Sequence, residues 1–403
     1  MAITADRVTP RVLAGGPWYV ARQPLRPVRG YPPESPGAAM SGTSPLGTEG
    51  PGVRNLLPSL SIQRDLICVG PALVAGAWIA LPLGFGLLFG QLGPAVLASI
   101  GALNVLLILM TTQRARRWKV FGLAAPLNAL AFTVGAALGT GPILLAVPLS
   151  GLGILLIEVV SYRAALPEVI IVVSACFVIG LGLNTTGAAS LPDVFGFFLL
   201  GGLWALVLVP AVTWWNDRRL ASFPPPDRTV DALAGVVTRS QWVSAIVTGI
   251  AISVGLLVGY LLKLPRDYWV LLTIVVVMRS SLTATLERAG SRISGTIVGA
   301  GVGGIVTVLF LPQPVSILLL VGFMAAALAF QRANYLLYAL FLTPFVIVLL
   351  NLLAPAGVTI AIDRVIDTLI GGVIGASALL VAGIVVRRWH CTLRSGGSRQ
   401  LQH

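Results

Sequence analysis

Two acidic side chains lie inside apolar stretches of this 403-residue sequence, where an ionisable group could do chemistry. Asp367 follows Arg364 by three residues, and Glu158 lies in an aliphatic run shortly before Arg163. We expect each acid about one helical turn inside its span. An ionisable group within a membrane is a functional candidate by default, so both are candidates for proton coupling or gating.

Each acid also has a structural interpretation. Asp367 could be an acid that the helix dipole favours near a helix start, with Arg364 as its partner. Glu158 could extend toward the membrane surface beside Arg163. The sequence leaves these alternatives open.

Basic and polar side chains form a second group of candidates. Arg279, Arg288 and Arg292 are expected in or beside a basic turn on the cytoplasmic side, where they could form a vestibule that attracts anions. They could equally anchor helix ends at the surface. Four polar residues inside predicted spans could line a path or form hydrogen bonds between helices, namely Asn104, Asn128, Thr273 and Asn351.

Motifs for enzymatic chemistry are absent from the sequence. There is no His-Glu-x-x-His, no Gly-x-Ser-x-Gly and no Walker A loop, and the two histidines, His390 and His403, lie near the C-terminus. The three cysteines, Cys68, Cys176 and Cys391, do not have the spacing of a metal site or a disulfide framework. We therefore expect neither an enzyme nor a bound cofactor or metal.

The composition indicates a membrane protein. Hydrophobic residues make up 56% of the chain and charged residues 10%, whereas soluble domains are about 25% charged. Long uninterrupted apolar runs predict an all-α polytopic membrane protein, because helices satisfy their backbone hydrogen bonds within lipid. The lipid bilayer is thus an expected partner. The net charge of +13 lies in loops and tails, so nucleic acid is not an expected partner.

Five regions follow from the distribution of apolar residues. Residues 1–61 are rich in Pro, Gly and Arg and are expected to form a disordered cytoplasmic tail without a signal peptide, within which Met40 is an alternative start. Residues 62–215 and 241–388 are two membrane halves of six helices each. Residues 216–240 form a cytoplasmic linker, and residues 389–403 form a cytoplasmic C-terminal tail.

Twelve stretches have the length that a bilayer requires, about 17–25 residues, although the eighth is short. We expect the eighth to continue through Ser280 to Ala284. The predicted spans are 66–83, 92–110, 120–138, 143–160, 169–183, 194–214, 242–262, 268–279, 293–311, 315–330, 335–353 and 365–386.

The two halves resemble repeats of one another. The segment 85–90 matches 254–259, and the pair Gly201-Gly202 matches Gly371-Gly372 at nearly the same offset. Because each half contains an even number of helices, the two repeats would be parallel, related by an axis along the membrane normal. Alternating the sides of the membrane places 24 of the 27 Lys and Arg residues on one side, which predicts that both termini are cytoplasmic in a plasma or inner membrane.

Glycines recur at four-residue intervals in the ninth predicted span. Gly295, Gly299 and Gly303 lie on one face of the helix, next to Thr296. This pattern predicts close approach of another helix, and it could alternatively line a substrate path with exposed backbone.

The second half resembles the fusaric acid resistance and aromatic acid exporter family, also called the integral membrane bound transporter family. The similarity covers residues 62–388 and is clear in the second half. A Trp and a Thr precede an Arg-x-x-Gly-Thr-x-x-Gly pattern, and a similar pattern opens the last helix. The matching residues are Trp269, Thr273, Arg292, Gly295, Thr296 and Gly299, then Arg364, Asp367, Thr368 and Gly371.

Three departures from the family pattern limit what the resemblance implies. Met278-Arg279 stands where many relatives carry Pro or Gln. A short linker stands where larger members have a soluble domain, and Phe197 occupies the position equivalent to Asp367 in the first half.

The resemblance implies efflux of small organic compounds, often anionic or aromatic, and makes Trp269, Thr273 and Arg279 candidates for the path. The alternatives are an anion channel similar to plant malate channels, or a non-transporting membrane subunit. Homo-oligomerisation stays open.

Overall fold

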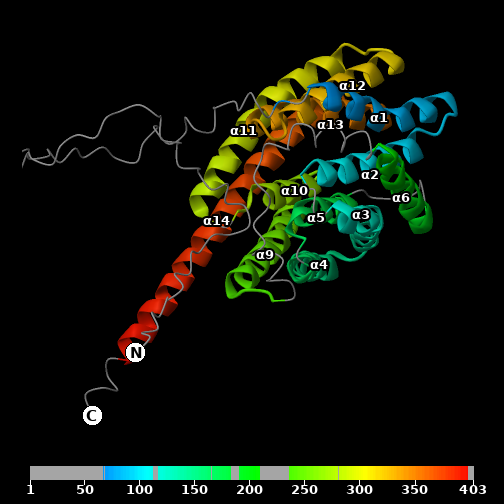
Figure 1. The fold of residues 1–403 in the computed structure, drawn as a ribbon. Helices are drawn as coiled ribbons and strands as arrows, with labels where there is room; N and C mark the ends of the chain where they lie inside the picture. The colour runs from blue at the N-terminus through cyan, green and yellow to red at the C-terminus, as the bar shows by residue number, and fades with distance from the viewer. Residues whose placement is uncertain are drawn as a thin grey trace, which may run out of the picture. The chain divides into compact units, whose positions relative to one another are not determined.

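The computed structural model describes residues 67, 69–111, 117–164, 166–182, 190–208, 236–279 and 281–397. The predicted tail 1–61 with Met40, the linker as far as residue 235, Cys68 and the side chain of Cys391 lie outside the described parts. Within these parts every regular element is a helix, which confirms the all-α prediction (Figure 1). The first half contains α1 Val69–Leu88, α2 Leu92–Thr111, α3 Arg117–Gly139, α4 Ile143–Arg163, α5 Pro167–Gly182 and α6 Leu191–Val207. The second half contains α9 Arg239–Leu261, α10 Tyr268–Val277, α11 Leu282–Val308, α12 Gln313–Phe330, α13 Tyr335–Leu353 and α14 Val358–Gly397.

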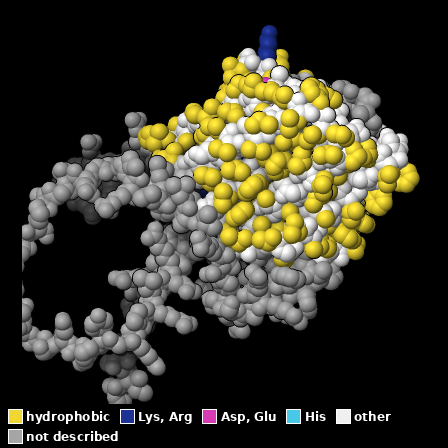
Figure 2. Space-filling view, turned by 90° about the horizontal axis from the view of Figure 1, so that it is seen from above, with side chains coloured by type: hydrophobic (Ala, Val, Ile, Leu, Met, Phe, Trp, Pro, Cys, Tyr) yellow, Lys and Arg dark blue, Asp and Glu magenta, His cyan; other side chains and the backbone are white. Residues whose placement is uncertain are grey.

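The outer surface of the helices is apolar, as a lipid environment requires. Eight of the described helices are long and apolar enough to cross a membrane, and four apolar helices are shorter. Leu144 is 85% exposed and Leu318 is 70% exposed. On the face seen in Figure 2, hydrophobic side chains dominate the described surface, and a basic side chain stands at its edge. Such a continuous apolar surface would be unfavourable in water, so these helices lie in a membrane.

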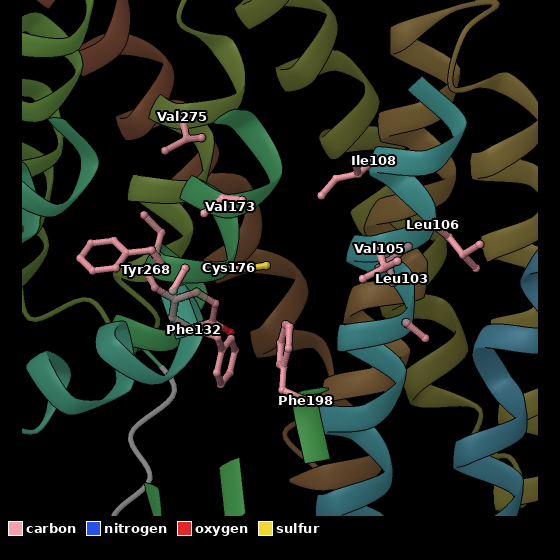
Figure 3. Packing of buried hydrophobic residues seen from close by; sticks show 14 of the residues in the cluster. Leu103, Val105, Leu106, Ile108, Phe132, Val173, Cys176, Phe198, Tyr268 and Val275 are labelled. Atoms are coloured by element: carbon pink, nitrogen blue, oxygen red, sulfur yellow. The ribbon is translucent and has the colours of Figure 1, made fainter. Parts of the chain in front are cut away.

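Each half packs internally and also contributes helices that pack against the other half. Within the first half, α3 packs against α5 and α2 against α6, and within the second half α11 packs against α13 and α14, and α10 against α14. Between the halves, α1 packs against α12 and α4 against α9. Apolar side chains fill the interior: in Figure 3, Phe132 of α3 faces Phe198 of α6, with ring centroids 4.5 Å apart, and Cys176 of α5 is buried nearby.

The connection between α10 and α11 differs from the prediction. The predicted continuation of the eighth span to Ala284 is wrong, because α10 ends at Val277 and Met278 has an extended backbone with ψ 133°. Ser281 caps α11 by accepting a hydrogen bond from the backbone N–H of Ala284. Helix α11 therefore begins well before residue 293. Hydropathy missed this start because the first turns of α11 carry polar and charged residues.

The earlier start of α11 changes the setting of two arginines. Arg288 and Arg292, which were expected in a basic turn, lie within the helix. The Arg-x-x-Gly-Thr pattern is consequently an internal segment of α11 and not its beginning.

Helix α14 also begins earlier than predicted and is 40 residues long. Its first turn follows Gly357, whose φ of +60° suits glycine at the end of the preceding connection. Asp367 therefore lies nine residues after Val358, more than two turns inside the helix. The interpretation of Asp367 as a helix-start acid is wrong, since the dipole effect fades within the first turn. Figure 1 shows the C-terminal part of α14 extending away from the other described helices.

Glycines bring α11 and α13 into backbone contact. A Cβ atom at Gly295 would lie 2.6 Å from the carbonyl oxygen of Leu336, and one at Gly299 would lie 2.4 Å from that of Leu340. Gly303 faces Ile347 and Pro344. These glycines therefore lie in a helix contact, which the four-residue spacing favours.

The last helix uses glycines in a similar way. A Cβ at Gly371 would lie 2.5 Å from the carbonyl oxygen of Val270 on α10, and Gly372 faces Ile293 of α11. Together these contacts hold α10, α11, α13 and α14 close to one another.

The contact at Gly299 gives a testable expectation for stability. Gly299→Val should lower the thermal denaturation midpoint of the detergent-purified protein, since overpacking costs about 1–3 kcal/mol. Gly301→Val is the matched control, because no atom lies within 4 Å of a Cβ at Gly301. Equal midpoints for the two variants would contradict the close contact of α11 with α13.

Candidate functional site

The site is built around Trp269, an indole ring buried near the start of α10. The ring is 1% exposed, and the guanidinium carbon of Arg364 on α14 lies 4.8 Å from its centroid. The guanidinium carbon of Arg266, in the connection before α10, lies 5.8 Å from the same centroid. Two cations thus share one aromatic ring, an arrangement that attracts them electrostatically.

Arg364 and Asp367 are both 1% exposed and lie one turn apart on α14. The Nε and Nη1 atoms of Arg364 and the Oδ2 atom of Asp367 have no hydrogen-bond partner. Their neighbour Thr368 donates its hydroxyl hydrogen to the carbonyl oxygen of Arg364, 2.7 Å away. Buried charged groups normally have their hydrogen bonds satisfied, so these free atoms mark a place where a ligand could bind.

Three more arginines extend the site along α11. Arg292 is 2% exposed and its Nε has no partner, while Arg288 is half-buried with its guanidinium carbon 3.1 Å from the ring centroid of Tyr335 on α13. Arg279 lies in the break between α10 and α11 and donates from Nη1 to the carbonyl oxygen of Met278, 2.8 Å away. The backbone N–H of Arg279 donates to the hydroxyl of Thr285, 2.9 Å away.

Arg279, Arg288, Arg292 and Arg364 form what we call the arginine column. Each acts electrostatically on the next: Arg288 on Arg279, Arg292 on Arg288, and Arg292 on Arg364. Arg292 and Arg364, at one end of the column, are the buried members. The column is therefore a line of positive charges that reaches into the protein interior.

Carboxylates balance only one end of this column. Asp367 lies beside Arg364, and Arg266 forms an ion pair with Asp363 at 2.5 Å. Burial raises the pKa of Asp267, in the connection before α10, and the backbone N–H of Tyr268 opposes this shift. Glu287, near Arg288, is exposed. The arginine column thus has an excess of positive charge that no described side chain neutralises.

The threonines of the site differ in what they offer. The hydroxyl of Thr273 donates to the carbonyl oxygen of Trp269 at 2.9 Å, so its hydrogen is engaged within α10. Thr296 is fully buried beside Arg292, and its hydroxyl has no partner. Thr296 is therefore the threonine that could contact a ligand.

Several candidates from the sequence meet in this site and one does not. Trp269, Thr273, Arg279, Arg288, Arg292, Arg364 and Asp367 all lie on or between α10, α11 and α14. Glu158 lies on α4, which packs against α9, α5 and α3. In the first half, Phe198 stacks on Phe132, so aromatic packing occupies the region next to Phe197, the counterpart of Asp367.

Two participants escaped the sequence analysis. Tyr335 and Tyr338 lie at the start of α13, with ring centroids 5.8 Å apart, and both act electrostatically on Arg288. The two tyrosines are three residues apart on an apolar helix, and this spacing could have indicated that both side chains lie on one face. The ion pair between Arg266 and Asp363 was not predicted either, because the two residues are far apart in the sequence and meet only in the folded protein.

The chemistry of the site is recognition of a negative charge. Guanidinium groups with free N–H donors bind carboxylates strongly, and a buried donor left unsatisfied costs about 1–3 kcal/mol. The rings of Trp269 and Tyr335 flank the charges. An anion with an apolar or aromatic body fits both features.

Comparison with known proteins agrees with this location. Residues 241–378 match the family described as fusaric acid resistance protein-like. The Inner membrane protein YccS of Escherichia coli is 37% identical over 115 residues, which are 28% of this chain and 16% of YccS. The Uncharacterized protein YhfK of the same organism is 31% identical over 122 residues, 30% of this chain and 17% of YhfK.

A Synechocystis protein, slr1298, is 30% identical over 125 residues, which are 30% of this chain and 16% of that protein. The matched segment thus spans less than a fifth of the length of these curated relatives. No solved structure matches the chain. The family match contains every residue of the arginine column, and the resemblance expected from the sequence is confirmed. The segment that carries the arginine column, residues 241–378, is therefore similar to the fusaric acid resistance protein-like family.

Proposed function

We propose that this chain is a transporter that exports small organic anions across the inner or plasma membrane. The observation that carries the proposal is the pair Arg292 and Arg364, both buried, with guanidinium nitrogens that no protein group accepts from. A charged group at this depth is costly unless it serves a ligand or a partner. A transported carboxylate would supply the missing partner and would leave again when the path opens.

Aromatic substrates are the preferred subclass of this proposal. Trp269 and Tyr335 present ring faces beside Arg364 and Arg288, so an aromatic body can pack where the carboxylate is bound. The family match, described by its resemblance to fusaric acid resistance proteins, supports efflux over uptake.

We also propose that the membrane region consists of twelve spans in two parallel six-helix repeats. Two pairs of equivalent helices start 170 residues apart: α1 and α9 begin at residues 69 and 239, and α4 and α12 begin at residues 143 and 313. The contact of α3 with α5 has its counterpart in α11 with α13, and that of α1 with α12 in α9 with α4. The excess of Lys and Arg on one side supports cytoplasmic termini.

The alternative assignments make different predictions. An anion channel would use the same positive charges but would not accumulate its solute. A non-transporting subunit would leave the unpartnered guanidinium nitrogens unexplained. We further propose that the chain has no enzymatic activity and that its partners are lipid and a small organic solute, with or without a second copy of itself.

Orientation can be checked with reporter fusions. A fusion that is active only in the cytoplasm, placed after Gln331 in the α12–α13 connection, should be active, because Arg332 lies on the side rich in positive charge. The same fusion after Lys263, between α9 and α10, should be inactive. The reverse pattern would invert the proposed topology.

The transport proposal predicts a specific sensitivity profile. Cells that lack the protein should become more sensitive to aromatic carboxylates, and the intact chain should restore growth. Arg292→Gln and Arg364→Gln should reduce export about ten-fold or more, since a hydrogen bond to a charged group contributes about 1.5–3 kcal/mol. Arg163→Gln, which removes an exposed arginine, is the matched control and should export normally.

Vesicle measurements separate the transporter from its alternatives. A transporter should accumulate the aromatic carboxylate against its gradient, whereas a channel should only equilibrate it. Normal export by Arg292→Gln and Arg364→Gln at normal membrane levels would contradict the role of the arginine column.

Anion binding can be measured without transport. Benzoate should raise the thermal denaturation midpoint of the purified chain, because a ligand at a hundred-fold excess over its Kd stabilises by about 2.7 kcal/mol. Benzamide, which has the same ring without the charge, should have a smaller effect. The stabilisation should be lost in Arg364→Gln and kept in Arg163→Gln; an equal response of all three chains would contradict the site.

A further inference from the structure

The contact between α4 and α9 joins the first half to the second and contains an unusual number of polar groups. Gly151 and Gly249 face each other so closely that a Cβ on either would lie 2.7 Å from the carbonyl oxygen of the other. The hydroxyl of Ser253 on α9 donates to the carbonyl oxygen of Val147 on α4, 2.9 Å away. The two helices are therefore held by specific contacts.

Glu158 lies in this contact. Its side chain is buried, with 6% exposure, and forms a hydrogen bond with the hydroxyl of Thr248 on α9. One turn further along α4, Tyr162 forms a hydrogen bond with the side chain of Ser244, also on α9. Arg163, which was expected beside Glu158, is exposed.

Among the residues whose side chains the structure describes, no cation contributes to balancing a negative charge on Glu158. Tyr162 on α4 is the titratable group that acts on it, and α9 presents the neutral groups Thr248 and Ser244. The parts of α3 and α5 whose side chains are described contain no Asp, Glu, Lys or Arg, and Cys176 is the titratable residue of α5. An ionised carboxylate buried without a partner is strongly unfavourable.

The hydrogen bonds of Thr248 favour a protonated Glu158 in this arrangement. A threonine hydroxyl has one hydrogen to donate. The hydroxyl of Thr248 donates it to the carbonyl oxygen of Ser244, 2.9 Å away, and a carbonyl oxygen can only accept. With its hydrogen engaged by Ser244, the Thr248 hydroxyl can accept a hydrogen bond from a protonated Glu158 carboxyl group.

We propose that Glu158 is a proton-binding site in the contact between α4 and α9, and that loss of its proton weakens this contact. The proton would leave to water at the nearby end of α4, five residues beyond Glu158. The remaining carboxylate could regain a donor only if the hydroxyl of Thr248 turned away from Ser244. The inference does not depend on the transported solute, since it concerns a proton and a contact between the two halves.

Infrared difference spectroscopy on the purified full chain tests the protonation. Raising the pH should remove a carboxylic acid C=O band from the unsubstituted protein, and the same pH change should leave no such band change in Glu158→Gln. In Thr248→Val the band should shift, because the carboxyl loses its acceptor. Identical difference spectra for the unsubstituted chain and Glu158→Gln would overturn the proposal.

A distance measurement tests the effect on the helix contact. Spin labels on cysteines at Leu152→Cys and Ile250→Cys, two exposed positions on α4 and α9, report their separation in a chain whose native cysteines are replaced by serine. At alkaline pH the population with a long separation should rise about two-fold or more, as expected for a shift between two states. Glu158→Gln should show the short separation at every pH. A separation that does not change with pH, or that changes equally in both chains, would exclude a role for the proton in this contact.

Discussion

A buried guanidinium cannot give its hydrogen bonds to lipid, and the second half of this protein is organised around that constraint. Arg292 and Arg364 are kept from the lipid by helices that approach to backbone contact. Gly299 lets α11 meet α13, and Gly371 lets α14 meet α10. Any side chain at these positions would separate the helices and expose the charges, so the glycines and the arginines form one arrangement.

The two halves share a similar set of helix contacts but differ in the side chains that fill their interiors. In the first half, Phe132 and Phe198 stack where α3 meets α6. In the second half, Arg292 on α11 and Arg364 on α14 carry positive charge in the interior. The buried positive charges therefore lie in the second half, whereas aromatic packing fills the corresponding helix contact of the first half.

The sequence was sufficient to predict the all-α membrane class and the positions of the helices that are apolar along their whole length. The span predicted at 335–353 matches α13, since Asn334 precedes its start and Pro355 follows soon after its end. Helices whose first turns contain charged residues were predicted to start too late. Hydropathy reads Glu287, Arg288 and Arg292 as a turn, whereas a helix can hold them when neighbouring helices cover them.

The residues of the candidate site could be predicted from the sequence, but their meeting at one location in the fold could not. Arg364, Asp367 and Trp269 were identified from their depth and from the family resemblance. Their joint location with Arg292 and Tyr335 depends on contacts between α10, α11, α13 and α14, and no local pattern encodes such contacts. The unpartnered state of the Arg364 nitrogens is also a property of three-dimensional packing alone.

The crossed pairing of α1 with α12 has a consequence for how the chain is made. Helix α1 leaves the ribosome before its partner α12, which is synthesised more than 200 residues later. Contacts between segments so distant in sequence form late. During synthesis, α1 must therefore wait in the lipid with its glycine at position 76, which meets α12 in the finished protein, uncovered. A chain released before residue 330 would leave α1 without this neighbour, so the membrane insertion machinery must tolerate an incomplete bundle until α12 has been made.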